Sequence, residues 1–131
     1  GGMLFAARLA LEMGVDAEFD YLHATRYHGE TKGSGLAWLH RPATIIEGRS
    51  VLLVDDILDE GHTLKAVRDW CEDQGAIKVK IAVMTTKQHD RCVPGLKADY
   101  SGLYVPDRYI FGYGMDINEH GRNLPGIYAL S

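Results

Sequence analysis

The chain has 131 residues, of which 46% are apolar and 24% are charged, and its formal net charge is −4. These values fit one globular domain with its own core and exclude global disorder. They also exclude a large positive field, because the basic residues are scattered and only Lys78 and Lys80 form a tight pair, so we expect no nucleic-acid partner.

The first predicted element is an amphipathic helix. Apolar residues recur at three- and four-residue steps from Leu4 to Met13, and Gly14 ends the pattern. Residues Ala17 to Thr25 mix aromatic and aliphatic side chains and predict a strand. Because the chain opens on Gly1-Gly2 directly before the helix, with no strand in front, we expect its native N-terminal part to be missing.

The segment Arg26 to Thr44 predicts a long loop or a loosely paired excursion. Glycines and Pro42 stand there among polar residues, with few apolar anchors. Loops of this length are uncommon and are often lids or binding loops. Residues Glu47 to Arg49 then predict a turn.

A strand, loop, helix and strand follow. Val51 to Val54 form an apolar run typical of a strand buried on both faces of a parallel sheet. Asp55 to His62 predict a polar loop, Thr63 to Gln74 predict a helix stopped by Gly75, and Val79 to Thr85 predict the next strand. Ligands of such right-handed crossover units bind outside the carboxyl ends of the strands. The polar loop therefore lies at the expected ligand position.

The remainder of the chain predicts shorter elements. Tyr100 to Val105 predict a strand that Pro106 ends, and Asp107 to Ser131, rich in aromatics and glycine, predict short strands and turns. The whole pattern predicts an α/β fold, with a mostly parallel sheet flanked by helices, in one domain over residues 1–131.

The polar loop carries groups suited to a phosphorylated ligand. Asp55 and Asp56 follow a buried strand, Gly61 permits a tight backbone path, and Thr63 stands at the start of a helix whose free N–H groups attract an anion. The carboxylates would hold a cation or ribose hydroxyls beside a phosphate. The alternative is a solvated acidic loop with Thr63 as a helix cap.

The string from Val51 to Thr63, VLLVDDILDEGHT, resembles the signature of type I phosphoribosyltransferases. The resemblance covers nearly the whole chain and is closest to the hypoxanthine-guanine enzymes of that family. It implies the type I phosphoribosyltransferase fold, with a small hood from residues 105–131 and a mobile lid from residues 26–44. The implied reaction moves the phosphoribosyl group from phosphoribosyl pyrophosphate to hypoxanthine or guanine, giving IMP or GMP and pyrophosphate.

The resemblance also implies roles in the polar loop. Asp55 and Asp56 contact the ribose hydroxyls, directly or through Mg²⁺, and Asp59 lies near N7 of the purine as its general base. The 5-phosphate is wrapped by Glu60, Gly61, His62 and Thr63. Related enzymes often have threonine and a small or basic residue where this chain has Glu60 and His62. Because a carboxylate repels phosphate, we expect the Glu60 side chain to point outward.

Two further segments match the part of the family that recognises the base. Lys87 follows a predicted strand where the 6-oxopurine enzymes place a lysine that donates to the exocyclic oxygen, although a lone lysine there is otherwise a surface charge. Residues Val105 to Asp116 resemble the base-binding hood, in which Tyr109 stacks on the purine and the Ile110 backbone contacts the ring edge. The alternative for Tyr109 and Phe111 is core packing, and we expect Phe111 to be structural.

The pyrophosphate side is implied by scattered residues. Gly1 and Gly2 resemble the end of the pyrophosphate loop, Arg122 would touch pyrophosphate, and Asp116 would bind a second Mg²⁺ held with it. Tyr27 matches a lid aromatic that closes over the reacting centre and excludes water, unless it only ends a strand.

Cellular setting and assembly are expectations of a broader kind. Two cysteines, Cys71 and Cys92, make no disulfide framework, and no apolar run approaches the roughly 20 residues that span a bilayer. Together with the lack of a signal-peptide pattern, this predicts a cytoplasmic protein without a membrane partner. The family resemblance implies a homodimer or homotetramer. A regulatory, nucleotide-sensing relative and an inactive fragment of the enzyme stand as alternatives.

Overall fold

The N-terminal part of the computed structural model, which describes residues 1–26 and 35–131, combines a helix with a short strand. Helix α1 (Met3–Met13) ends at Gly14, whose left-handed φ of 65° terminates it, as predicted. Strand β1 is only His23–Arg26, so the predicted strand over Ala17 to Thr25 is wrong before His23. Asp20 is the reason, because its carboxylate accepts hydrogen bonds of 2.7 to 2.9 Å from the backbone N–H groups of Tyr21, Ala43 and Thr44.

Strand β2 (Leu36–His40) pairs antiparallel with β1, so of the two alternatives predicted for Arg26 to Thr44, the described residues fit the paired excursion and not the long loop. Trp38 of β2 packs edge-on against Trp70, with 4.9 Å between ring centroids, which anchors this pair of strands. Tyr27 and the centre of the expected lid, residues 27–34, lie outside the described residues.

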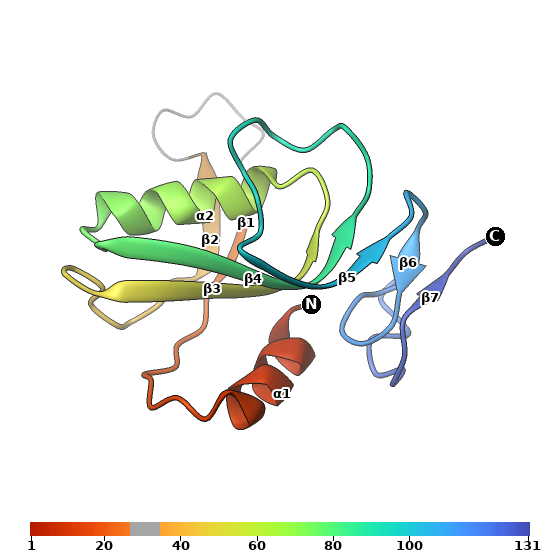
Figure 1. Ribbon diagram of the computed structural model, residues 1–131, viewed down its shortest axis with the longest axis horizontal. Helices are drawn as coiled ribbons and strands as arrows, with labels where there is room; N and C mark the ends of the chain where they lie inside the picture. Colours follow the sequence, from red (N-terminus) through yellow and green to blue (C-terminus); the bar gives the residue numbers. More distant parts are fainter. Residues whose placement is uncertain (27–34) are drawn as a thin grey trace.

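The main sheet is parallel, with strands in the order β3 (Ser50–Leu58), β4 (Lys78–Lys87) and β5 (Tyr100–Val105). Helix α2 (His62–Asp73) connects β3 to β4, and Gly75 follows it with a φ of 93°. Figure 1 shows α1 and α2 on opposite sides of this sheet. The predicted crossover unit and its parallel sheet are therefore confirmed.

Strand β3 is longer than predicted, so Asp55 and Asp56, the acidic pair, lie in the strand and not in the loop after it. Asp55 pairs with Val83 and Leu58 with Thr86, so backbone pairing continues past the apolar run. Asp55 and Asp56 consequently belong to the strand, and the predicted loop over Asp55 to His62 shrinks to residues 59–61. The prediction that Val51 to Val54 are buried on both faces of the sheet is wrong, because only Leu53 among them is buried and Leu52 is 37% exposed. The covering on one side is incomplete, since helix α1 buries none of its own residues.

Two apolar clusters hold these layers together. The larger one lies between α2 and the sheet and includes Val67, Cys71, Ile81 and Val83. The smaller one joins Met84 of β4 to Ile110 and Met115, with Phe5 and Val105 packed against it. Strand β6 (Ile110–Phe111) pairs antiparallel with β7 (Tyr128–Ala129), as the short-strand prediction expects. The smaller cluster thus fixes this C-terminal hood near the carboxyl ends of the main strands (Figure 1).

Candidate active site

The carboxyl ends of β3 and β4 bring two predicted site residues into contact. Asp59 follows β3 directly, and Lys87 is the last residue of β4. The Lys87 Nζ atom lies 3.2 Å from Asp59 Oδ2, and the Lys87 side chain is only 12% exposed. A nearly buried ammonium group with one carboxylate partner is set to donate a further hydrogen bond into the adjacent space.

His89 is a site residue that the sequence did not reveal. Its side chain is 3% exposed, and its Nε2 atom lies 2.6 Å from Asp59 Oδ1. Burial alone would raise the pKa of Asp59, but the hydrogen bonds from His89 and Lys87 outweigh it and place the pKa below its usual value. Asp59 is therefore held as a carboxylate. The only sequence signal was a histidine two residues after the predicted lysine.

The acidic pair of β3 has a different electrostatic environment. Burial, and next the charge of Asp56, raise the pKa of Asp55 to about 7, although the Asp56 N–H donates to Asp55 Oδ1 at 2.8 Å. Asp56 is itself buried, and its carbonyl accepts a 3.0 Å hydrogen bond from Thr85 Oγ1. Two neighbouring carboxylates, one buried and one partly buried, favour a ligand that brings positive charge.

Gly1 and Gly2 lie against this pair. A Cβ atom on Gly1 would overlap the Asp56 carboxylate, and one on Gly2 would lie 3.0 Å from Asp55 Oδ1. A side chain at Gly1 would therefore displace the Asp56 carboxylate, and one at Gly2 would crowd Asp55, because the backbone approaches the carboxylates so closely.

The short loop of residues 59–61 leads directly into the N-terminus of α2. Gly61, with a φ of 84°, is the residue that caps the helix, and α2 begins at His62, so Thr63 lies within the first turn and is not its cap. The first N–H groups of a helix lack partners within the helix and attract anions. The Glu60 side chain is 53% exposed and lies 3.5 Å from His62 and 4.0 Å from Arg91. It is exposed, as its charge predicts.

The hood supplies the remaining predicted residues. Tyr109 is half exposed, and its hydroxyl donates to the Asp116 carbonyl at 2.9 Å. Arg122 donates to the Gly114 carbonyl at 2.7 Å and lies 3.8 Å from the Asp116 carboxylate. Phe111 stacks on Tyr128 with 5.8 Å between centroids, which gives it the structural place that we expect.

These parts meet around a pocket of about 260 Å³. Ile57 and Met115 contribute apolar surface, and the other lining residues are all ones that the sequence predicts for the site: Asp56, Asp59, Lys87, Tyr109, Ile110, Asp116 and Arg122. The pocket joins a carboxylate, an ammonium group and an exposed aromatic ring, which suits a flat ligand with both donors and acceptors.

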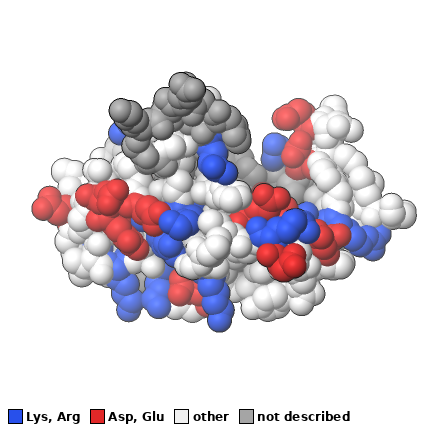
Figure 2. Space-filling view, turned by 90° about the horizontal axis from the view of Figure 1, so that it is seen from above, with Lys and Arg blue, Asp and Glu red and all other residues white. Residues whose placement is uncertain are grey.

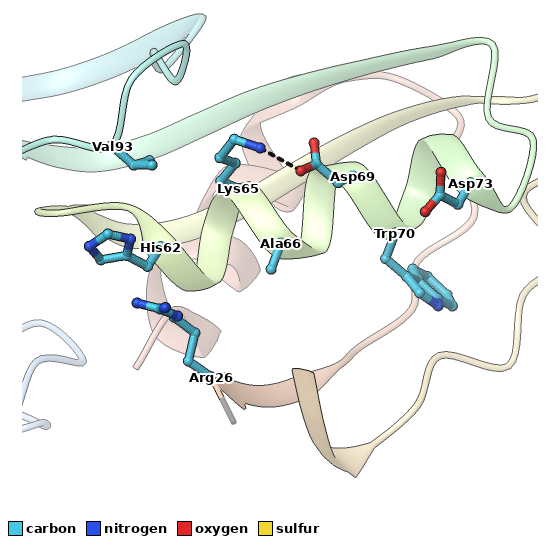
Figure 3. A pocket seen from close by; sticks show the side chains of 8 residues that line it. All are labelled: Arg26, His62, Lys65, Ala66, Asp69, Trp70, Asp73 and Val93. Atoms are coloured by element: carbon cyan, nitrogen blue, oxygen red, sulfur yellow. Dashed lines mark hydrogen bonds and ion pairs between the residues drawn. The ribbon is translucent and has the colours of Figure 1, made fainter. Parts of the chain in front are cut away.

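A larger hollow of about 470 Å³ lies elsewhere, along α2. Figure 3 shows Arg26 and His62 at one end of it, with the ion pair of Lys65 and Asp69 further along the helix. His62 is the only predicted site residue among those that line it. Because the predicted groups converge on the smaller pocket instead, we place the candidate active site there.

Figure 2 shows one face of the molecule, on which acidic and basic side chains are interspersed. Among the helices in the described ranges, none is long and apolar enough to cross a membrane.

The fold and the site define a phosphoribosyl transferase domain. Residues 1–118 match that family, and the chain therefore belongs to it. Within the family, the chain is 39% identical over 131 residues to the hypoxanthine-guanine phosphoribosyltransferase of Streptococcus pneumoniae, covering 99% of this chain and 72% of that protein. It is 38% identical to the enzyme of the same name from Lactococcus lactis, of which it covers 70%.

Solved structures agree. A hypoxanthine phosphoribosyltransferase from Staphylococcus aureus superposes with a TM-score of 0.90 at 29% identity, over 100% of this chain and 71% of that one. A hypoxanthine-guanine phosphoribosyltransferase from Bacillus anthracis gives a TM-score of 0.89 at 32% identity, over 100% of this chain and 77% of that one. The predicted fold class and family are thereby confirmed.

Proposed function

We propose that this protein transfers the phosphoribosyl group from phosphoribosyl pyrophosphate to a 6-oxopurine, hypoxanthine or guanine, in purine salvage. The observation that carries the proposal is the pocket that joins Asp59, Lys87 and Tyr109 at the carboxyl ends of β3 and β4. Curated relatives named hypoxanthine-guanine phosphoribosyltransferase support the choice of base.

In the proposed complex, the purine stacks on Tyr109 while Lys87 donates to its exocyclic oxygen. Lysine has no acceptor, so it favours an oxo group over the amino group of adenine. Asp59 takes the proton from N7 as N9 forms its bond to the anomeric carbon and the bond from that carbon to pyrophosphate breaks. The carboxylate is suited to this role because its hydrogen bonds hold it deprotonated.

The phosphates and ribose occupy the rest of the site. The 5-phosphate lies on the backbone N–H groups from Glu60 to Thr63, at the start of α2. The ribose hydroxyls donate to Asp55 and Asp56, and pyrophosphate lies between the Gly1-Gly2 backbone and Arg122.

The oxygen ligands of the site fit Mg²⁺. In the described ranges no three His, Cys, Asp or Glu side chains form a metal site of their own, but Mg²⁺ is usually held by one or two carboxylates together with substrate phosphates. Asp55 and Asp56 would hold one ion, which would offset the burial and the repulsion that raise the pKa of Asp55. Asp116 would hold a second one with pyrophosphate. Bound Mg²⁺ supplies positive charge that stabilises the leaving pyrophosphate.

The test is a panel of hypoxanthine, guanine, xanthine and adenine with phosphoribosyl pyrophosphate and Mg²⁺. We expect turnover of hypoxanthine or guanine and little of adenine. Asp59→Asn should lower kcat by roughly 100-fold or more, because general base catalysis contributes about that much. Asp69→Asn, a carboxylate change on the exposed side of α2, is the matched control. Near-normal turnover by Asp59→Asn, or adenine as the preferred base, would contradict the proposal.

We further propose that the protein is a cytoplasmic homo-oligomer, a dimer or a tetramer. Cys71 and Cys92 are both free, which suits a reducing compartment. Light scattering coupled to gel filtration measures the assembly, and a monomer at micromolar concentration would contradict it.

A further inference from the structure

His89 has no role in the function proposed above, yet it makes the shortest contact of the Asp59 carboxylate. Its Nε2 lies 2.6 Å from Asp59 Oδ1, whereas Lys87 Nζ lies 3.2 Å from Oδ2. The side chain of His89 is 3% exposed, and that of Asp59 is 41% exposed. A buried imidazole thus approaches the carboxylate from the protein side, and the other side of Asp59 faces the pocket.

The backbone decides which imidazole nitrogen carries the proton. The Arg91 N–H donates to His89 Nδ1 at 3.0 Å, so Nδ1 is an acceptor. In the neutral imidazole the other nitrogen then carries the hydrogen. Nε2–H therefore donates to Asp59, and this hydrogen bond is charge-assisted because its acceptor is ionised.

His89 is held in place from both sides along the chain. The Gln88 N–H donates to the Val105 carbonyl at 2.9 Å, which ties the start of this turn to the end of β5. Arg91 makes a bidentate pair with Asp107, with distances of 2.7 and 2.9 Å. This pair is too exposed to stabilise the fold much, but it fixes the path of the turn between the sheet and the hood.

We infer that His89 is a positioning residue, whose Nε2–H fixes the orientation of the Asp59 carboxylate and keeps Oδ2 and Lys87 directed into the base pocket. The inference rests on the proposed function, in which Asp59 is the base. Without His89, Asp59 would rotate more freely and its charge would lose one of its two hydrogen-bond donors.

The charged groups around Asp59 make a pH readout possible. Lys87 and His89 donate to it, and further charges lie beyond them or line the same pocket: Asp56, Glu60, Arg91, Asp107, Asp116 and Arg122. Removal of the His89 donor leaves the burial of Asp59 in place, so its pKa should rise. Asp55, whose pKa is about 7, would otherwise dominate the acidic limb, so the profile of kcat/KM for hypoxanthine is measured at saturating phosphoribosyl pyrophosphate and Mg²⁺, which ionise Asp55. Its acidic limb should then move to higher pH.

The experiment compares His89→Leu with His89→Gln, which keeps an N–H donor near the Nε2 position. We expect His89→Leu to lower kcat/KM for hypoxanthine by about 10- to 100-fold, as loss of a hydrogen bond to a charged group does. Its acidic limb should move up by about one pH unit. His89→Gln should recover most of the activity and keep the limb near that of the unaltered protein. Equal losses in both variants with an unmoved limb, or no loss in either, would overturn the inference.

Two measurements keep the test decisive if His89→Leu folds poorly. His89→Asn stays polar but is too short to reach Asp59, and it should behave as the leucine variant does. In the unaltered protein, long-range ¹H–¹⁵N spectra should show His89 as the Nε2–H tautomer, and a proton on Nδ1 would overturn the inference. This spectrum requires no turnover, so its outcome is distinguishable from a failure of the proposed reaction.

Discussion

Gly61 is the position where a single added methyl group should disturb the short loop before α2 most. Its φ of 84° is in the left-handed region, and a Cβ atom there would overlap Leu96 Cδ2 and lie 3.1 Å from Leu58 Cδ1. Both leucines are buried in the cluster between α2 and the sheet. Gly61→Ala should therefore lower the free energy of unfolding for two reasons, the left-handed backbone conformation and the steric overlap with the leucines.

The two costs can be separated with a second glycine. Gly95 has a φ of 80°, and a Cβ atom there would meet nothing within 4 Å. Gly95→Ala should lower the free energy of unfolding by about 1–2 kcal/mol, the left-handed cost alone. Gly61→Ala adds overpacking of a buried cluster, about 1–3 kcal/mol, so we expect a total loss of about 2–5 kcal/mol.

Urea unfolding followed by tryptophan fluorescence measures both variants at one pH. The difference between the two losses is the steric term at Gly61, which we expect to be at least about 1 kcal/mol. Equal losses would refute the reasoning, because Leu96 would then move aside without strain. A loss at Gly95 larger than that at Gly61 would refute it as well.

Three other predictions address the base, the acidic pair and the strand behind it. Lys87→Gln removes a charged donor and introduces an acceptor, so kcat/KM for hypoxanthine should fall about 10- to 100-fold. The ratio of kcat/KM for hypoxanthine to kcat/KM for adenine should also fall. A ratio equal to that of the unaltered protein would contradict the role of Lys87. The pKa of Asp55 is raised to about 7, so the folded state retains a proton that the unfolded chain releases near pH 4. The free energy of unfolding, taken as the difference between the unaltered protein and Asp55→Asn, should therefore fall as pH rises from about 4 to 7 and level off above. Urea titrations without ligand across that range measure this difference. A difference that rises with pH would contradict the prediction. Thr85→Val leaves the buried Asp56 carbonyl without its hydroxyl donor and should lower the free energy of unfolding by about 1–3 kcal/mol in the same assay, whereas a neutral effect would show that the hydrogen bond contributes nothing net.

Periodicity and local chemistry predicted much of the fold from the sequence. The helix that Gly14 ends, the crossover through α2 and strand β5 over Tyr100 to Val105 all follow from local signals, and the structure has them within a few residues. The errors lie where a distant partner decides the backbone. Asp20 replaces strand pairing by binding the N–H groups of Ala43 and Thr44, and no local pattern shows a contact across more than 20 residues.

The residues of the candidate site likewise divide into those that local sequence predicts and those that a distant contact places. Asp59, Lys87 and Tyr109 were predicted because each stands in a segment that resembles the family, and all three line one pocket. His89 was not predicted, since a histidine in a turn carries no signal of its own. The position of His89 depends on the Arg91 N–H and on the bidentate pair that Arg91 makes with Asp107, 16 residues after Arg91.

The electrostatics of β3 and its loop assign different tasks to carboxylates that are close in sequence. Burial and a neighbouring charge raise the pKa of Asp55 to about 7, whereas two hydrogen-bond donors lower the pKa of Asp59. Groups whose environments push their pKa values apart are suited to different chemical roles. Asp59 is held as a carboxylate by two hydrogen-bond donors, as its proposed role of proton acceptor requires. Asp55 retains part of its proton near neutral pH until a cation or a hydrogen-bond donor approaches, which fits the role in binding ribose and Mg²⁺ proposed for the acidic pair.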